Sequence, residues 1–386
     1  MICFFFAIFA VMRFDDVIGH QGAKERLIRM IQEERLPHSL LISAPVGSGE
    51  MMLARALAQY IHCSGRAPGA TDSCGRCPSC LLHQSLNHSD LHFIFPVLKK
   101  KNQTDTLSDD WLADWRDFLR EDPWMDFRQW QSTLGNPNGQ PKIYVHDAEA
   151  LRRKMSLSAR SSDVNIALIW LPEKMQPETA NKLLKLIEEP EAGSMFILVS
   201  NSPAEVLPTI YSRCQRIELR RLSDTDAASA LADGFTPDAN QLAAAHLAEG
   251  NVIAAREEAG NSKDSALFLD LFMALMRQAY ARKIGELKKW SEQVADLGRE
   301  TEARFLDYCQ RMVRENFIYN LKIQALNYMT GPEQQFSERF CPFINERNVE
   351  QIISELNEAK TDIQGNGNAK IIFFDLAIKM IMLLKK

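Results

Sequence analysis

The chain has 386 residues, of which 46% are hydrophobic and 25% charged, and its formal net charge is −5. This composition supports a sizeable soluble core and about two or three domains. It excludes a global basic field that would hold nucleic acid unaided, so any DNA contact needs a local patch or partner subunits. Eight cysteines, four of them clustered, indicate a cytoplasmic protein with a metal site and not a disulfide scaffold.

The N-terminal segment Met1–Met12 is apolar but too short to span a bilayer. It lacks the basic region of a signal peptide, because Arg13 follows the apolar run. Met12 opens a conventional start of its own. We therefore expect the segment before Met12 to be a misassigned start or a disordered extension, which mass spectrometry of the native N-terminus would decide.

The stretch Leu40–Leu53 has the layout of a phosphate-binding loop, in which an apolar run leads into a glycine-containing turn and then a helix. Its phosphate-binding chemistry is missing. A carboxylate repels a triphosphate and a thioether is a poor magnesium ligand, so we expect a nucleotide-binding fold that no longer uses nucleotide. The alternative is an unrelated strand–turn–helix. The degenerate loop residues are Ala44 at the first glycine, Gly47, Gly49, Glu50 at the lysine and Met51 at the serine or threonine.

Four cysteines follow the loop helix, and two of the gaps between them are Cys-x-x-Cys. This spacing lets the sulfurs close a tetrahedron around one zinc ion at about 2.3 Å, and four protein ligands make the site structural. Free cysteines or a redox pair are the alternatives. Three flanking histidines could replace one thiol, but we expect ordinary surface positions for them. The predicted ligands are Cys63, Cys74, Cys77 and Cys80, and the flanking residues are His62, His83 and His88.

Residues from about 90 to 140 form a tryptophan-rich insertion with many acidic residues. Base stacking is conceivable, but the acidic residues repel a phosphate backbone, so we expect packing against the core or a partner. The run Lys99–Lys101 could touch phosphate, although a solvated loop is the preferred interpretation. The aromatic residues are Trp111, Trp115, Phe118, Trp124, Phe127 and Trp130.

Apolar runs and helical patterns alternate as far as Leu219, which predicts a doubly wound parallel sheet. The run Asn165–Leu171 reads as a buried parallel strand. An ATPase places magnesium-holding carboxylates at the end of this strand, but here Trp170, Leu171 and Pro172 stand there and only Glu173 follows. A second nucleotide-site element is therefore degraded. The remainder of the chain is predicted to be helical, without an internal repeat.

Several motifs together resemble the AAA+ clamp-loader subunits of bacterial DNA polymerase III, in particular the delta-prime group. The resemblance covers Arg13–Leu219 by motif and the helical remainder by architecture only. The run through Glu188-Glu189-Pro190 and the Ser-Arg-Cys motif are the most specific parts. The matching stretches are Phe14–Gln21, Leu36–Leu41, the four-cysteine insertion, Ala180–Pro190 and Ser212–Cys214.

The resemblance implies an AAA+ α/β domain over residues 13–220, a helical lid over 221–262 and a helical collar for oligomerisation over 263–386. It implies a place in a five-subunit ring, with motor and delta subunits as neighbours, that loads the sliding clamp at primer–template DNA. Delta-prime subunits usually do not bind ATP, and no intrinsic catalysis is expected although the subunit belongs to the DNA-directed DNA polymerase holoenzyme. The Ser-Arg-Cys motif implies that Arg213 acts as an arginine finger in a neighbour's ATP site. The zinc ligands of the family match the four cysteines at 63–80.

The insertion at about 90–140 departs from the common family pattern, and its role stays open. Family ATPases also place an arginine near the start of a lid helix, where this chain has Ile253, while Arg256 lies about a turn further on. Two alternatives are an active motor subunit, which needs a lysine at Glu50, and a stand-alone zinc DNA-binding module. The second needs a basic stretch beside the cysteines, where only Arg66 and Arg76 are available.

Overall fold

The computed structural model describes residues 12–100, 106–136, 139–157, 159, 161–232, 236–260, 262–322 and 327–385. The predicted N-terminal extension up to residue 11 and Lys101 therefore lie outside the described residues. Contacts divide the chain into two compact units, Met1–Arg256 and Glu257–Lys386. The finer predicted limits of the lid and collar remain predictions.

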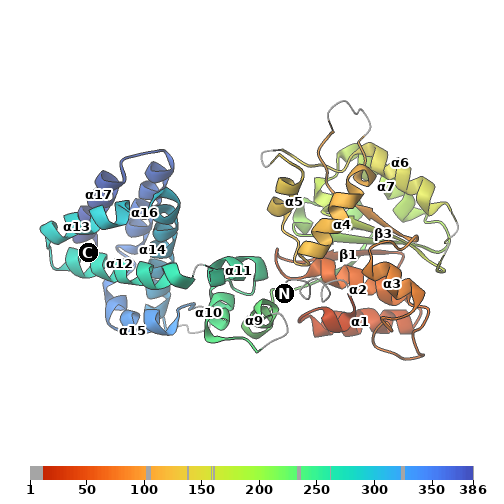
Figure 1. Ribbon diagram of the computed structural model, residues 1–386, viewed down its shortest axis with the longest axis horizontal. Coiled ribbons are helices and arrows are strands. Elements are labelled where there is room, and N and C mark those ends of the chain that lie inside the picture. Colours follow the sequence, from red (N-terminus) through yellow and green to blue (C-terminus); the bar gives the residue numbers. More distant parts are fainter. Residues whose placement is uncertain are drawn as a thin grey trace, which may run out of the picture. The chain divides into compact units, whose positions relative to one another are not determined.

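The first unit is built on a five-stranded, wholly parallel sheet (Figure 1). The order β2-β3-β4-β1-β5 places β1 in the interior of the sheet, so the loop after β1 starts from a buried strand. This confirms the predicted doubly wound parallel sheet. The strands are β1 (Ser39–Ser43), β2 (Leu91–Ile94), β3 (Asn165–Trp170), β4 (Ser194–Ser200) and β5 (Gln215–Glu218).

Successive side chains of each strand point to opposite faces of the sheet. Both faces are apolar, and helices cover each of them, so that two apolar clusters form. Leu40 and Ile42 pack with one cluster, and Leu41 packs with the other. The first cluster includes residues of α1, α2, α4 and α5, and the second includes residues of α6, α7 and α8 (Figure 1). The helices up to this point are α1 (Gln21–Gln32), α2 (Glu50–His62), α3 (Pro78–Gln84), α4 (Leu112–Glu121), α5 (Phe127–Thr133), α6 (Val145–Met155), α7 (Pro177–Glu188) and α8 (Pro208–Tyr211).

The tryptophan-rich insertion packs into the core of the first unit, which confirms one of the two predicted roles. Trp115 of α4 stacks on Phe95 with ring centroids 4.1 Å apart, and Trp130 of α5 meets the same phenylalanine edge-on at 5.4 Å. Trp115 also contacts Trp170 at the end of β3, with centroids 5.1 Å apart. The insertion therefore forms an additional wall over the carboxyl end of the sheet, where the loop after β1 also lies.

Helices follow the sheet to the end of the described chain. α9 (Asp224–Leu231) and α10 (Ala239–Leu247) belong to the first unit, and α11 (Val252–Gly260) spans the boundary between the units. The second unit has its own apolar core and no strand among its described residues. None of the described helices is long and apolar enough to cross a membrane. The helices of the second unit are α12 (Ser262–Tyr280), α13 (Ile284–Ala295), α14 (Arg299–Asn320), α15 (Gly331–Phe340), α16 (Val349–Gln364) and α17 (Ala369–Leu383).

Candidate functional site

The predicted phosphate-binding loop has the expected backbone shape. It leaves β1 at Ala44 and enters α2 at Glu50, with Gly49 as the N-cap residue. Gly47 and Gly49 have φ angles of 78° and 85°, in the left-handed region that glycine adopts without strain. The strand, the glycine turn and the start of the helix are therefore present as predicted.

Two side chains of the same unit cover the two glycines. A Cβ atom on Gly49 would lie 3.1 Å from the Trp124 indole, and one on Gly47 would lie 2.1 Å from Asn251 Oδ1. The backbone N–H of Val252 also donates to the Gly47 carbonyl over 3.1 Å. The insertion and the start of α11 thus pack directly against the two glycines of the loop.

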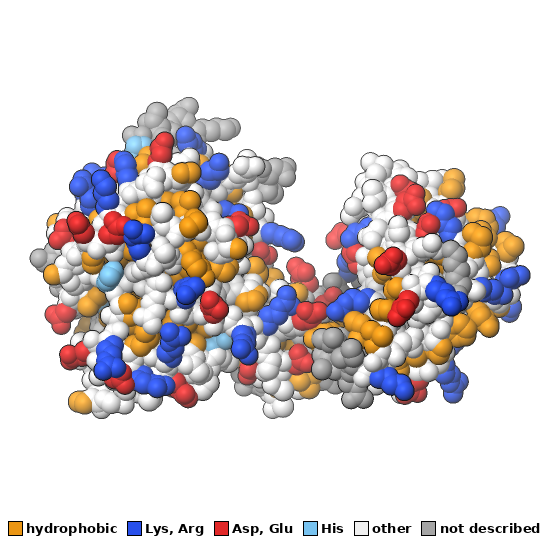
Figure 2. All heavy atoms as spheres, turned by 180° about the vertical axis from the view of Figure 1, so that it is seen from behind, with side chains coloured by type: hydrophobic (Ala, Val, Ile, Leu, Met, Phe, Trp, Pro, Cys, Tyr) orange, Lys and Arg blue, Asp and Glu red, His pale blue; other side chains and the backbone are white. Residues whose placement is uncertain are grey.

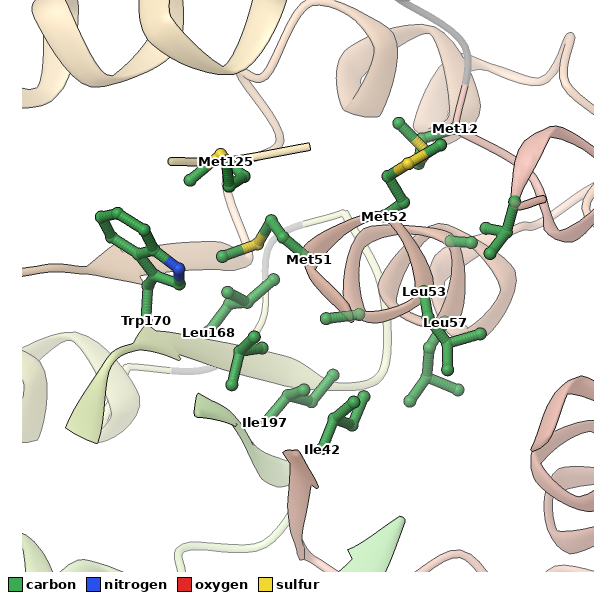
Figure 3. Close-up of a cluster of buried hydrophobic side chains, with 14 of the residues drawn as sticks. Met12, Ile42, Met51, Met52, Leu53, Leu57, Met125, Leu168, Trp170 and Ile197 are labelled. Carbon is green, nitrogen blue, oxygen red and sulfur yellow. The ribbon is translucent and has the colours of Figure 1, made fainter. Parts of the chain in front are cut away.

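The remaining walls around the loop are apolar. Figure 3 shows Met51 pointing toward Trp170, with Met125 above them. At most 1% of each of these side chains is exposed. Met125 adopts a left-handed φ of 56°, a strained conformation for a non-glycine residue that its packed surroundings maintain. A serine or threonine that ligates magnesium is thus replaced by a thioether in a dry apolar contact.

Glu50 is buried at the position of the missing lysine, with 1% of its surface exposed. Desolvation by burial raises the pKa of Glu50 to about 7, although a hydrogen bond from Asn201 Nδ2 over 2.6 Å opposes the shift. Glu173, the acidic residue after β3, accepts hydrogen bonds on its Oε1 from the backbone N–H groups of Asn201 and Ser202. Glu50 therefore places a carboxyl group, and not a cation, where a phosphate-binding loop has its lysine.

The candidate lid arginine holds the covering segment in place. Arg256 Nη1 lies 2.9 Å from Asp122 Oδ1, and the same carboxylate oxygen accepts the backbone N–H of Trp124 over 3.0 Å. Ile253, at the position expected for the family arginine, packs against the apolar core. Arg256 thus anchors the residue that lies against Gly49.

The four predicted cysteine ligands come together. Their sulfurs all lie within 4.8 Å of one another, and the Cys63–Cys77 and Cys74–Cys80 pairs are each 4.0 Å apart. A zinc tetrahedron with bonds of about 2.3 Å has edges of about 3.8 Å, so the spacing fits one ion. No described cysteine forms a disulfide.

Backbone amides complete the environment of the sulfurs. The N–H of Cys74 donates to Cys63 Sγ over 3.2 Å, and the N–H of Cys77 donates to Cys74 Sγ over 3.3 Å. Desolvation is the largest influence on Cys77, but hydrogen bonds from Ser64, Cys80 and Gly65 outweigh it and lower the pKa of Cys77 to about 5. A thiolate is thus already favoured at this position, which suits metal ligation.

The three flanking histidines are buried, so the predicted surface positions are wrong. His62 and His83 face each other from α2 and α3, with His62 Nδ1 and His83 Nε2 2.8 Å apart. Burial lowers the pKa of His62 to about 3 and that of His83 to about 2, so both rings are neutral. The reason is tertiary: α3 folds back against α2 and encloses the rings.

Each ring of this histidine cluster has a hydrogen-bond partner, and the ligand nitrogens of the three rings lie within 4.8 Å of one another. His62 Nε2–H donates to the Val164 carbonyl over 2.9 Å, which leaves Nδ1 to accept from His83. The N–H of Asp90 donates to His88 Nδ1 over 3.2 Å, so His88 Nε2 carries its proton toward Ser79 Oγ, 3.0 Å away. The cluster is therefore a neutral hydrogen-bonded network.

Arg213 lies far from its own loop. It precedes β5, and its carbonyl accepts a hydrogen bond from Ser39 Oγ at the start of β1. The loop leaves the other end of β1 at Ala44, roughly 16 Å away at about 3.3 Å per residue. The Arg213 side chain is 42% exposed, and its Nε lies 2.5 Å from Glu188 Oε1. The backbone of Arg213 therefore lies at the opposite end of β1 from the loop.

Comparison with known proteins identifies the family. Residues 19–223 match the model of the family described as DNA polymerase III, delta subunit, which is more than half of the chain. The chain belongs to this family. Its matched region includes the covered loop, the four cysteines and Arg213, and ends shortly after β5.

Relatives with curated names agree with the family. The chain is 30% identical over 178 residues to DNA polymerase III subunit delta' of Haemophilus influenzae, covering 46% of this chain and 41% of that protein. It is 30% identical over 191 residues to the subunit delta' of Escherichia coli, covering 50% and 45%. The chain thus spans less than half the length of these relatives. Subunit tau of Bacillus subtilis is 22% identical over 266 residues, covering 69% and 38%.

The matches among solved structures are more distant. A DNA polymerase III gamma subunit-related protein of Thermotoga maritima is 13% identical, covers 94% of this chain and 99% of its own, and has a TM-score of 0.35. The assignment of the fold rests on the parallel strand order and on the family match, and not on this structure.

Sequence reasoning missed the residues that close the loop. Asn201 and Asn251 lie in separate segments after β4 and before α11, and no local pattern links them to the glycine turn. Nothing in the sequence distinguishes Trp124 from the other members of its aromatic stretch. The acidic neighbour Asp122 offered no signal either, because its role depends on Arg256 approaching from the other end of the unit.

Proposed function

We propose that this chain is a delta-prime-like subunit of the DNA polymerase III clamp loader, a ring member that does not hydrolyse ATP. The observation that carries the proposal is the covered loop, in which Trp124 lies against Gly49 and a buried Glu50 stands in place of the lysine. Phosphate binding needs free backbone N–H groups and a cation at these places. The family match supports the assignment to DNA polymerase III.

The relatives' names support a place in a multi-subunit loader. Several are DNA polymerase III subunits delta' and another is a subunit tau. We infer that the partners of this chain are the motor and delta subunits of a hetero-pentameric ring in the cytoplasm. Contact with the sliding clamp and primer–template DNA then comes through the assembled ring. Basic and acidic side chains are interspersed on the face shown in Figure 2, so that face carries no single large basic surface.

Within this proposal Arg213 is an arginine finger that acts in trans. Arg213 lies far from its own loop, and its side chain is 42% exposed. Both features support the proposal that it extends into the ATP site of a neighbouring subunit. Its present partner Glu188 is half exposed, so the ion pair is weak and can be exchanged for a phosphate. In a neighbour's site the guanidinium would stabilise the negative charge that develops on the transferred phosphoryl group. The motor-subunit alternative lacks support, because Glu50 and Met51 cannot bind phosphate and magnesium.

Zinc is the cofactor that we propose for the cysteine cluster, with Cys63, Cys74, Cys77 and Cys80 as ligands. All four tetrahedral positions are taken by sulfur, so the ion would fix the loop between α2 and α3 and leave no open position for catalysis. We propose no ATP site for the isolated chain.

Equilibrium binding of a fluorescent ATP analogue with magnesium tests the proposal directly. We expect no saturable binding to the isolated chain up to millimolar concentration. An active motor subunit from the same organism serves as the positive control. Micromolar, magnesium-dependent binding or ATP turnover by the isolated chain would overturn the non-hydrolysing role. A pull-down from cell extract that recovers no DNA polymerase III subunit would overturn the place in the loader.

A further inference from the structure

The second unit contains a hollow of about 760 Å³ between α12 and α15. All of its lining residues belong to Glu257–Lys386, a part of the chain that the family model does not cover. Its size lies within the range of ligand pockets, and it is open to solvent along one side. It is therefore too small for a folded domain and large enough for a few side chains of a partner segment.

The floor of the hollow is apolar and aromatic. Met273 and Met276 of α12 face Phe336 and Phe340 of α15, whose rings stack with centroids 4.9 Å apart. Tyr280 lies at one end and is 51% exposed. Methionines adapt their shape to an incoming side chain, and aromatic side chains supply most of the contact area in binding sites. An exposed concave surface of this kind indicates a binding site.

The rim of the hollow is basic. Arg277 and Arg339 are exposed and have no ion-pair partner among the residues that the structure describes. Lys385 Nζ lies 5.6 Å from the centre of the Tyr280 ring. Glu338 is the acidic residue in the lining. Because the whole chain carries a net charge of −5, this local excess of positive charge is complementary to carboxylates.

We propose that this hollow binds a short segment of a partner protein, a helix whose apolar face is flanked by aspartates or glutamates. The apolar side chains enter between α12 and α15, and the carboxylates meet Arg277 and Arg339 at the rim. Helices that lie in apolar grooves bind through anchors at i, i+3, i+4 and i+7, which a hollow of this size accommodates. The proposal does not depend on the covered loop or on Arg213.

Fluorescence anisotropy with designed peptides tests this proposal on the full chain. The probe is a labelled helical peptide with leucine and phenylalanine on one face and glutamates at its edges. We expect saturable micromolar binding. A peptide with lysines in place of the glutamates, and one with serines in place of the apolar residues, should bind at least about tenfold more weakly. Equal binding of the acidic and basic peptides, or no binding of the acidic one, overturns the proposal.

Charge reversal locates the binding surface. The double variant R277E/R339E should weaken binding of the acidic peptide by about tenfold or more, since two attractions become repulsions. The matched control K288E/R347E makes the same charge change at exposed positions elsewhere in the unit and should change binding less than twofold. Met273→Gln, which removes only an apolar contact, should also weaken binding. Equal losses in both double variants would overturn the location.

A second copy of this chain is the competing occupant. Sedimentation velocity of the unmodified chain separates the two cases. We expect a monomer whose sedimentation is unchanged by R277E/R339E. A dimer that this double variant dissociates would assign the hollow to self-association and overturn the proposed partner. Circular dichroism and thermal melting of each variant confirm that the helices stay folded.

Discussion

Glu50 places a carboxyl group at the position where the loop of a nucleotide site has a positively charged lysine. Its carboxyl group is fully buried and hydrogen-bonded to Asn201. Burial raises its pKa from 4.5 in the unfolded chain to about 7. The folded state therefore binds one more proton than the unfolded state between these pH values, and stability must fall as the pH rises through this window.

Glu50→Gln removes this proton linkage. The wild-type chain should lose about 3 kcal/mol of unfolding free energy between about pH 4.5 and 7 through this group, while the variant should lose none of it. Denaturant unfolding at several pH values gives the unfolding free energy of the wild type and of the variant. The slopes of these two free energies against pH are then compared. The control Glu178→Gln, at an exposed site on α7, should leave the wild-type slope unchanged. Parallel pH profiles of Glu50→Gln and wild type would contradict the buried acid.

Arg213 is the residue whose role depends on a neighbour. Arg213→Ala should leave the fold and the metal content unchanged, and should slow ATP hydrolysis by the reconstituted complex by up to about 10³-fold or more. The matched control is Arg216→Ala, which removes an exposed arginine three residues away on β5. Unchanged DNA-stimulated hydrolysis and clamp loading in the Arg213 variant would exclude the finger.

At the scale of elements, the segment between α2 and α3 is held by thiols instead of an apolar core. Cys77→Ser should release the zinc and lower the melting temperature of the first unit, because metal-binding free energy contributes to folding. Metal analysis and a thermal melt measure both effects. Cys341→Ser, a buried cysteine of the second unit, should retain the full metal content. Full zinc occupancy in the Cys77 variant would exclude that residue as a ligand.

The loop between α4 and α5 is the element that covers Gly49. Trp124→Ala should cost about 3–5 kcal/mol of stability, because the large side chain is 98% buried. Trp124→Phe should cost clearly less, since it keeps most of the contact. Denaturant unfolding gives both values. Neither variant should bind ATP, because Glu50 still stands at the lysine position. Magnesium-dependent ATP binding by Trp124→Ala would show that the covering side chain alone closes the site.

At the scale of the molecule, two separate apolar cores predict two independent folding units. A fragment spanning residues 257–386 should fold alone, with helical circular dichroism and a cooperative melt. A fragment that ends at residue 368 should not, because α17 supplies Phe373, Leu376 and Met380 to the core. A non-cooperative melt of the longer fragment would mean that the second unit needs the first.

The sequence by itself determined the features that depend on local order. The strand–turn–helix at Ala44–Glu50, the alternation that builds the parallel sheet and the cysteine spacing of the proposed zinc site all follow from periodicity, glycine conformation and ligand chemistry. The family motifs then indicated the place of Arg213. Each of these signals is contained within a short stretch of chain, so each could be read before the fold was known.

Only the tertiary structure decided what fills the space around those features. Trp124, Asn201 and Asn251 reach the loop from three distant segments, and the buried histidines depend on α3 folding against α2. The hollow between α12 and α15 likewise exists only because two helices far apart in the chain are packed side by side. Packing between distant segments leaves no periodic pattern in the sequence. Which side chains meet depends on their shape and burial in the folded chain.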